Sequence, residues 1–329
     1  SAMQVKATRE FALEMDVTHF YENGVVGVEH ALLPELGLVG PGDVVVGADS
    51  HTCTYGALGA FATGFGSTDL AAAMALGETW FKVPDSILVT FNGALPAFVT
   101  GKDLILWLIG QIGVDGARYQ ALEFAGSTIA GMGMDGRMTM ANMAIEAGGK
   151  TGLFPVDDIT LAYTKAAGRT GDLPLSADPG ATYIRKIIHD VSGMEPVVAC
   201  PHQPDSVKPV SDVSGVDIQQ VVIGSCTNGR ISDLRDAAAV LHGRQVDKKV
   251  RCIVLPATPG IWKQALAEGL IETFMDAGCI VGPATCGPCL GGHMGILADG
   301  ERAVATTNRN FRGRMGSLES EVYLANPAV

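Results

Sequence analysis

The sequence predicts an α/β protein with mainly parallel sheets, on the strength of three observations. Hydrophobic residues make up 47% of the 329 residues, which is enough to fill buried cores, while aromatic residues make up only 6%. Glycine occurs 42 times, and tight glycine turns at strand ends are more typical of α/β domains than of all-β sandwiches. Short apolar runs alternate with helical patterns along the chain, and strands separated by helices pair in parallel. The length accommodates two or three domains.

Charge and composition argue against several other classes. The net charge of −12 makes the chain a poor general binder of nucleic acid, whose phosphates require basic patches. Small acidic substrates remain compatible, because a few local arginines can hold a carboxylate. No apolar run is long enough to span a membrane and no signal peptide opens the sequence, so we expect no membrane partner. Seven cysteines without small-scaffold spacing predict free thiols in a reducing cytoplasm.

The first block of the pattern covers residues 1–85. It opens inside a helical pattern, and the chain stops without an evident cap, so we expect a protein truncated at both ends or one subunit of a larger assembly. An apolar run at 44–46 predicts a strand that leads into a polar turn, and 69–81 predict a helix. This helix is expected to take its cap from one of three residues: Ser67, Thr68 or Asp69.

The second block covers residues 86–200. Its pattern predicts four elements in order: a strand over 86–93, a helix over 102–113, a strand over 119–126 and a helix closed by glycines over 139–152. A looser stretch follows, and the Pro, Ser and Asp content of 197–215 predicts a linker.

The third block covers residues 201–329 and is the most regular. Its pattern predicts six segments in order: a strand over 218–224, a helix over 231–243, a strand over 250–258, helix over 259–278, a strand over 279–285 and a last strand and turn over 301–311. Open parallel sheets bind ligands beyond the carboxyl ends of their strands. We therefore expect the loops after these strands to converge on one point.

Three cysteines occupy these carboxyl-end loops. Cys226 follows the strand over 218–224, and Cys286 and Cys289 follow the strand over 279–285. A C-x-x-C pair in a reducing compartment is compatible with a zinc site, a redox pair or two structural thiols. A structural zinc usually has four ligands, often with a second close pair, and no second pair exists here. Three thiolates also suit an iron–sulfur cluster with one iron left open, which can act as a Lewis acid.

Two further polar loops carry candidate site residues. Asp49, Ser50 and His51 stand together after a strand, where a carboxylate can fix the tautomer of an imidazole for acid–base work. The alternative is a solvated turn rich in Asp and Ser. Arg309 and Arg314 flank a glycine in a polar loop and are candidates for clamping substrate carboxylates, although a solvated basic loop has the same composition. The G-x-G-x-x-G match at 131–136 follows no apolar strand, so we interpret it as a loop and not as a dinucleotide site.

Four motifs occur together in this chain: GADSHTCTYGALGAF, IGSCTNGR, PATCGPCLGGHMG and TTNRNFRGRMG. With KATREFA and MANMAIEAGGK they make the sequence resemble the aconitase superfamily over nearly its whole length. The similarity is greatest to the branch of isopropylmalate isomerases and homoaconitases, which are divided into a large and a small subunit. The resemblance implies an aconitase-like fold of successive three-layer α/β/α domains around a central iron–sulfur site. On this basis the blocks at 1–85, 86–200 and 201–329 are expected to be three domains, the first incomplete.

The resemblance also implies roles for individual residues. Cys226, Cys286 and Cys289 match the ligands of a [4Fe–4S] cluster whose fourth iron stays open for the substrate, and an aerobic preparation can lose this cluster. The remaining matches are Asp49, Ser50, His51 and His30 as groups that hydrogen-bond the iron-bound water or hydroxyl, Glu123 as a glutamate near the open iron, and Arg309 and Arg314, accompanied by Asn308, as substrate-binding groups.

The implied activity is that of the catalytic large subunit of a hydro-lyase. A base removes a proton next to a carboxylate, hydroxide leaves, and water returns at the neighbouring carbon, which in this branch interconverts 2- and 3-isopropylmalate during leucine synthesis. The alternatives are a homoaconitase or aconitase-type subunit acting on another hydroxy di- or tricarboxylate and, from another class, a non-catalytic metal or cluster scaffold. RNA binding, known for some aconitase relatives, is disfavoured by the acidic charge.

Two parts of the family's machinery are not found in this sequence. An Asp-His pair, expected to donate a proton, lies upstream of the first residue, and the serine base lies on a swivelling domain that forms the separate small subunit. We therefore expect the chain to be catalytically incomplete alone, with a small subunit and a small hydroxy-carboxylate as partners and no nucleic acid.

Overall fold

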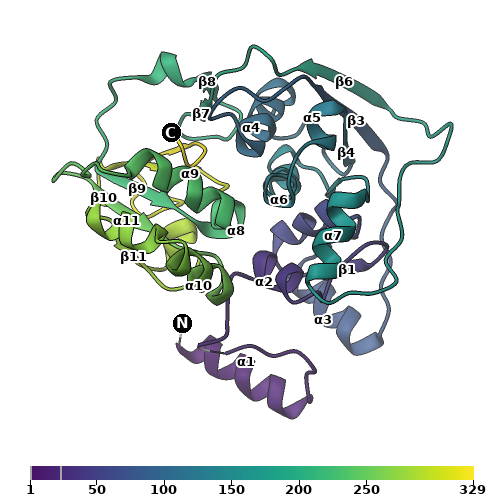
Figure 1. Ribbon diagram of the computed structural model, residues 1–329. Helices are drawn as coiled ribbons and strands as arrows, with labels where there is room; N and C mark the ends of the chain where they lie inside the picture. Colours follow the sequence, from purple (N-terminus) through teal and green to yellow (C-terminus); the bar gives the residue numbers. More distant parts are fainter. Residues whose placement is uncertain (1, 23) are drawn as a thin grey trace.

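The computed structural model describes residues 2–22 and 24–329. Two parallel-rich sheets organise the chain, with helices packed around them (Figure 1). The larger sheet has seven strands in the order β11-β10-β9-β12-β13-β7-β8. Its strands are β7 (Val197–Ala199), β8 (Val207–Pro209), β9 (Gln220–Ile223), β10 (Arg251–Val254), β11 (Ile280–Val281), β12 (Arg302–Ala305) and β13 (Glu321–Leu324). Strands β9 to β13 are parallel to one another, whereas β7 and β8 form an antiparallel edge.

The smaller sheet has four parallel strands in the order β5-β4-β3-β6. They are β3 (Ser86–Asn92), β4 (Ala121–Ala125), β5 (Thr151–Leu153) and β6 (Arg185–Asp190). A further parallel pair joins β1 (Val44–Gly47) to β2 (Phe61–Gly64). The structure therefore confirms the α/β class with mainly parallel sheets.

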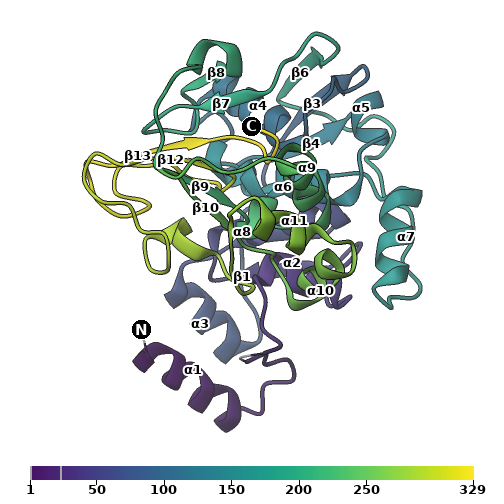
Figure 2. The same cartoon turned by 60° about the vertical axis from the view of Figure 1, so that its left-hand side comes forward.

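The helices connect and cover these strands. The α-helices are α1 (Ala2–Glu14), α2 (Glu29–Glu35), α3 (Ser67–Leu76), α4 (Gly101–Ile112), α5 (Ser127–Ala130), α6 (Met134–Asn142), α7 (Asp158–Ala166), α8 (Ser225–Asn228), α9 (Ile231–Leu241), α10 (Pro259–Ala267) and α11 (Leu270–Asp276). The 3₁₀ helices are η1 (Ser50–Leu58), η2 (Met143–Ala147), η3 (Val210–Val213) and η4 (Gly287–Leu290). Helix α1 stands apart from the main body in both views (Figures 1 and 2). Within the described part of the chain, we find no helix that combines the length and apolar character of a membrane span.

One buried cluster crosses the boundaries between the three expected domains. It runs from Val39 to Leu324 and draws side chains from each block, including Tyr55 of η1, Leu104 of α4 and Leu255 after β10. Burial of such apolar surface provides the main stabilisation of the fold, at about 25 cal/mol per Å². The division into three domains stays a prediction, because the core is continuous across it.

Several elements differ from the sequence-based expectation. Helix α3 ends at Leu76 because Gly77 adopts φ 72°, and its N-cap is Gly66 without a side-chain hydrogen bond, so none of the three expected residues caps it. The helical stretch at 259–278 is broken at Gly269, where φ is 75°. The expected linker at 197–215 supplies β7 and β8. These two strands have three residues each, which is too short for a periodic pattern to reveal.

Candidate active site

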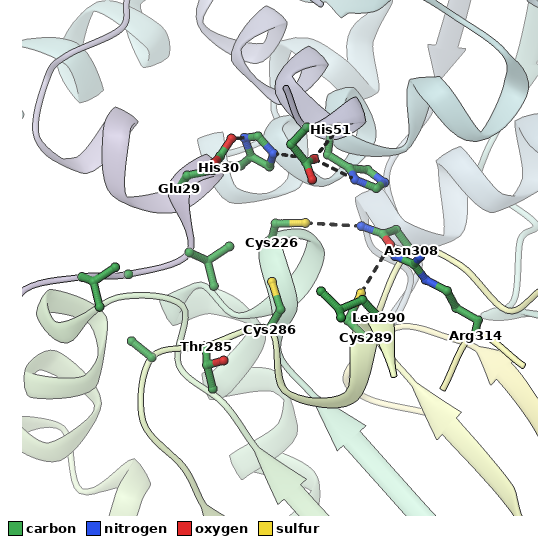
Figure 3. Close-up of a pocket in the computed structure, with 15 residues that line it drawn as sticks. Glu29, His30, His51, Cys226, Thr285, Cys286, Cys289, Leu290, Asn308 and Arg314 are labelled. Carbon is green, nitrogen blue, oxygen red and sulfur yellow. Dashed lines mark hydrogen bonds and ion pairs between the residues drawn. The ribbon is translucent and has the colours of Figure 1, made fainter. Parts of the chain in front are cut away.

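Three thiols lie around one cavity of about 370 Å³ (Figure 3). Cys226 lies in α8 directly after β9, while Cys286 and Cys289 lie in the loop and 3₁₀ turn after β11. Strands β9, β10 and β12 end side by side, since Val254 pairs with Ile223. The carboxyl-end loops therefore meet at one edge of the sheet, as the strand pattern predicted.

Glycines at two positions allow these loops to approach the sheet closely. Gly224, before α8, has φ 149°, and a Cβ there would lie 2.6 Å from the carbonyl oxygen of Leu255. Gly287 has φ 55°, and a Cβ there would lie 2.2 Å from the Leu255 side chain. Both conformations are costly for any residue with a Cβ. The C-x-x-C turn is consequently held against the end of β10, with both thiols directed to the cavity.

A single amide connects two of the thiols. Asn308 lies in the turn after β12 and donates a hydrogen bond from Nδ2 to Cys226 Sγ at 3.3 Å. Its Oδ1 lies 3.7 Å from Cys289 Sγ. A hydrogen bond from the Cys286 thiol, helped by the nearby His51 and His30 rings, holds the pKa of Cys226 well below the usual thiol range. Cys226 is therefore the thiol most ready to act as a thiolate ligand.

Cys289 lies in a different electrostatic environment. Burial raises the pKa of its thiol to about 11, and the Arg314 and Arg309 guanidinium groups oppose this increase. Deprotonation of Cys289 therefore requires a positively charged ligand, such as a metal, to replace the proton.

The facing wall of the cavity carries a chain of hydrogen bonds between ionisable groups (Figure 3). His30 Nε2 lies 3.0 Å from Asp49 Oδ1, and His51 Nδ1 lies 3.2 Å from the same oxygen. His51 Nε2 lies 2.8 Å from Glu146 Oε1, and His30 Nδ1 lies 3.1 Å from the hydroxyl of Tyr55. Asp49 and His51 are held by local structure, because the Asp49 side chain also accepts from His51 N at the start of η1.

The pKa shifts indicate which groups in this series of hydrogen bonds carry a proton. Burial alone would lower the pKa of His51, but hydrogen bonds to Asp49 and Glu146 outweigh it and raise the pKa to about 9. Hydrogen bonds from His30 and His51 hold the pKa of Asp49 far below its usual range. His51 is thus a cation at neutral pH and donates from both ring nitrogens. Asp49 is ionised and only accepts, so His30 Nε2 and His51 Nδ1 both donate to it. Burial raises the pKa of Tyr55, which therefore keeps its hydroxyl proton.

The two arginines of the polar loop behave differently. Arg309 donates from Nε to both Glu146 oxygens, at 2.8 and 3.0 Å, and from Nη2 to Ser50 Oγ at 3.0 Å. Arg314 lines the cavity, and its buried Nε has no hydrogen-bond partner among the described residues. Arg314 makes no ion pair among the described residues and lies against Cys289, whereas Arg309 is engaged in the wall.

Glu123 does not lie with the other predicted site residues. It belongs to β4 and lines a second cavity of about 580 Å³, where the Tyr183 hydroxyl donates to its carboxylate at 3.0 Å. Residues of β4 project from the smaller sheet and do not reach the carboxyl ends of β9 and β11. The glutamate near the thiols is Glu146, which sequence reasoning missed. Its signal was an acidic residue inside the apolar helical segment MANMAIEAGGK, where only a paired charge is buried.

The three thiols suit an iron–sulfur cluster better than a single metal ion. Among the residues that the structure describes, no set of three or more His, Cys, Asp or Glu side chains converges closely enough to hold a single metal ion. An iron–sulfur cluster needs its ligands farther apart than a single ion does, because each thiolate binds a separate iron atom. Three thiols around one cavity, one of them with a lowered pKa, fit such a group.

Comparisons with known proteins place the chain in a family. The family model described as "Aconitase family (aconitate hydratase)" matches residues 1–329. The chain is 78% identical over 329 residues to the protein named "3-isopropylmalate dehydratase large subunit" of Nitratidesulfovibrio vulgaris (strain DSM 19637 / Miyazaki F), covering 100% of this chain and 78% of that protein. It is 63% identical over 329 residues to the protein of the same name from Heliobacterium modesticaldum, with the same two shares.

A solved structure shares the fold. The Thermococcus kodakaraensis aconitase X structure (holo-form) matches with a TM-score of 0.50 and 16% identity, covering 86% of this chain and 67% of that one. At this identity the likeness concerns the fold alone. The family model matches the whole chain, and the sequence relatives are highly identical to it. The chain therefore belongs to the aconitase family.

Proposed function

We propose that this chain is the large, catalytic subunit of a hydro-lyase that interconverts 2- and 3-isopropylmalate by dehydration and rehydration in leucine biosynthesis. The observation that carries this proposal is the meeting of three thiols with the His30–Asp49–His51 chain in one cavity. The substrate is taken from the relatives, which are named 3-isopropylmalate dehydratase large subunits.

Cys226, Cys286 and Cys289 would hold a [4Fe–4S] cluster with one open iron. When bound, the cluster supplies a Lewis acid for the hydroxyl and carboxylate of the substrate. The chain's own part is to hold the three sulfurs in position, and Asn308 contributes by donating a hydrogen bond to Cys226 Sγ and accepting one from the Cys289 thiol.

The polar wall binds and orients the hydroxy acid. Arg314 lines the cavity without an ion pair among the described residues, and it binds a substrate carboxylate because a guanidinium matches a carboxylate in charge and geometry. Arg309 stays close to this position through Glu146 and Ser50, and it can exchange these partners for a second carboxylate. Asp49 is half exposed to the cavity and can accept a hydrogen bond from the reacting hydroxyl or water, while His30 and His51 hold it in place.

A small subunit completes the site. The relatives are named large subunits, and the family resemblance assigns the serine base to the smaller partner. The seven cysteines are free thiols in the structure, which supports a cytoplasmic location.

Activity of the combined subunits tests this proposal. The chain is reconstituted anaerobically with iron and sulfide, mixed with candidate small subunits and assayed on 3-isopropylmalate, homoaconitate and citrate. We expect turnover of 3-isopropylmalate only in the mixture. Turnover of homoaconitate or citrate alone would replace the substrate assignment, and one zinc per chain without acid-labile sulfide would favour the scaffold alternative.

A further inference from the structure

A buried lysine lies behind the thiols without lining their cavity. Lys102 is the second residue of α4, and it is 0% exposed. Its Nζ donates hydrogen bonds to the carbonyl oxygens of Thr306 at 2.8 Å and Thr307 at 2.6 Å. These carbonyls lie in the turn after β12, more than 200 positions away along the chain. These two hydrogen bonds therefore fix the start of α4 against the turn after β12.

The two anchored residues lead directly to the thiols. Thr307 precedes Asn308, whose amide contacts Cys226 and Cys289. Thr306 Oγ1 accepts from the backbone N–H of Gly224 at 2.9 Å and donates to its carbonyl oxygen at 3.1 Å. Gly224 begins the turn that carries Cys226. The Lys102 ammonium group therefore holds the Cys226 loop and the Asn308 loop together through Thr306 and Thr307.

The location of this lysine is unfavourable on general grounds. Positive charge in the first turn of a helix opposes the helix dipole, and burial of a charge without a partner costs free energy. No ion pair joins Lys102 to a carboxylate in the part of the chain that the structure describes. The adjacent Asp103 accepts hydrogen bonds from Val197 N and Asn326 Nδ2, and Asp233 accepts from Asn228.

The electrostatic surroundings indicate what offsets this cost. Burial lowers the pKa of Lys102 to about 7, and the negative charges that oppose this decrease are Asp233, Cys226, Asp103 and Cys289. Two of these four are proposed cluster ligands. A negatively charged group held by the thiolates would therefore stabilise the ammonium form.

We propose that Lys102 is a positioning residue of the thiol site: it fixes the loops that carry Cys226 and Asn308, and its charge offsets that of the loaded site. This inference rests on the iron–sulfur cluster of the proposed function. It assigns to Lys102 an effect on the cluster itself, in addition to an effect on folding.

The experiment compares Lys102→Met with Arg137→Met. Arg137 is the matched control, because it is also a 0% exposed cation of the same core but pairs with Asp157, away from the thiols. Both variants and the wild type are reconstituted anaerobically. The measurements are iron per chain, the rate of iron release to a chelator, the reduction potential from an EPR titration, and the thermal midpoint of the metal-free chain.

We expect Lys102→Met to release iron at least several-fold faster and to shift the reduction potential to more negative values, because loss of a nearby cation disfavours the reduced, more negative cluster. Arg137→Met should lower the thermal midpoint without changing either cluster property. Lys102→Gln, which keeps N–H donors but no charge, should show the same shift of potential and serves if the Met variant does not fold.

A wild-type potential and release rate in a folded Lys102 variant would overturn the inference and leave the proposed function intact. Failure of the wild type to take up a cluster would instead overturn the proposed function, and this inference with it.

Discussion

At the scale of single residues, Glu146 lies between two cations in the cavity wall. His51 donates to its Oε1 at 2.8 Å, and Arg309 donates to both oxygens. Its side chain is only 2% exposed, so each of these hydrogen bonds is shielded from water. This position explains why His51 stays protonated and why Arg309 stays close to the cavity.

Substitution of Glu146 tests this role. We expect Glu146→Gln to lower kcat/KM by about 10- to 100-fold, since it weakens charge-assisted hydrogen bonds worth roughly 1.5–3 kcal/mol each. The measurement is steady-state kinetics of the two-subunit enzyme. Glu123→Gln is the control, because Glu123 lies in the other cavity with Tyr183. A larger loss in Glu123→Gln than in Glu146→Gln would show that the glutamates are wrongly assigned.

The loop arginine provides a second prediction at this scale. Arg309→Lys keeps the charge but loses the planar fork that contacts Glu146 and Ser50. We expect KM to rise about tenfold or more with a smaller change in kcat. The exposed Arg312→Lys, in the same loop, should have no effect on either constant. An unchanged KM in Arg309→Lys would remove this residue from substrate binding.

At the scale of elements, an ion pair joins α6 to the N-terminus of α7. Arg137 is fully buried and contacts Asp157 at 2.6 Å, and Asp157 also accepts from the N–H groups of Ile159 and Thr160 as the N-cap of α7. Burial alone would raise the pKa of Asp157, but the Arg137 guanidinium and these N–H groups outweigh it and lower the pKa. The pair therefore stabilises the fold in a pH-dependent way.

We expect Asp157→Asn to lower the free energy of unfolding by about 2–3 kcal/mol, because it leaves a buried guanidinium unpaired. A carboxyl with a lowered pKa stabilises the fold above its unfolded pKa of about 4 and loses this contribution as the pH falls through the folded pKa. The free energy of unfolding, measured with urea between pH 3 and pH 7, should therefore change more with pH in the wild type than in the variant. The exposed Glu10→Gln is the control, and equal pH dependence in Asp157→Asn and the wild type would contradict the prediction.

The turn before α8 is a second element-scale feature. We expect Gly224→Ala to destabilise the protein by about 2 kcal/mol or more, since its φ of 149° and the Leu255 carbonyl leave no room for a Cβ. Gly193→Ala, where a Cβ would meet nothing within 4 Å, should stay within about 0.5 kcal/mol of the wild type. Thermal unfolding of the metal-free proteins measures both, and a neutral Gly224→Ala would show that this turn is not strained.

At the scale of the whole molecule, the cavity is assembled from segments of the first and third blocks, which lie far apart in the sequence. Cys226, Cys286 and Cys289 lie in segments that follow strands of the seven-stranded sheet, whereas Asp49 caps η1 and His51 lies within it. A ligand that binds the three thiols only in the folded state stabilises that state by mass action. Cluster loading should therefore raise the thermal midpoint, measured anaerobically against the metal-free chain.

Cys226→Ser should abolish this increase, while Cys252→Ser, in β10 and outside the cavity, should keep it. An increase that survives in Cys226→Ser would mean that this thiol is not a ligand.

The alternation of short apolar runs and helical patterns was enough to predict the α/β class, the positions along the chain of β1, β3, β4, β9, β10, β11 and β12, and the meeting of Cys226 with Cys286 and Cys289 at the carboxyl ends of strands. These features follow from local periodicity and from the geometry of parallel sheets, both of which can be read from consecutive residues. The motif resemblance added the family, which the comparisons confirmed.

Only the tertiary structure decided which charged side chains meet. Glu146 and not Glu123 lies beside His51, Arg309 and not Arg314 pairs with Glu146, and Lys102 holds the turn that leads to Asn308. Such pairings join residues far apart in sequence, and they depend on which groups lose their water and must find partners in the core. A periodic pattern carries no information about that choice, because it describes the face a residue occupies and not the neighbour it meets there.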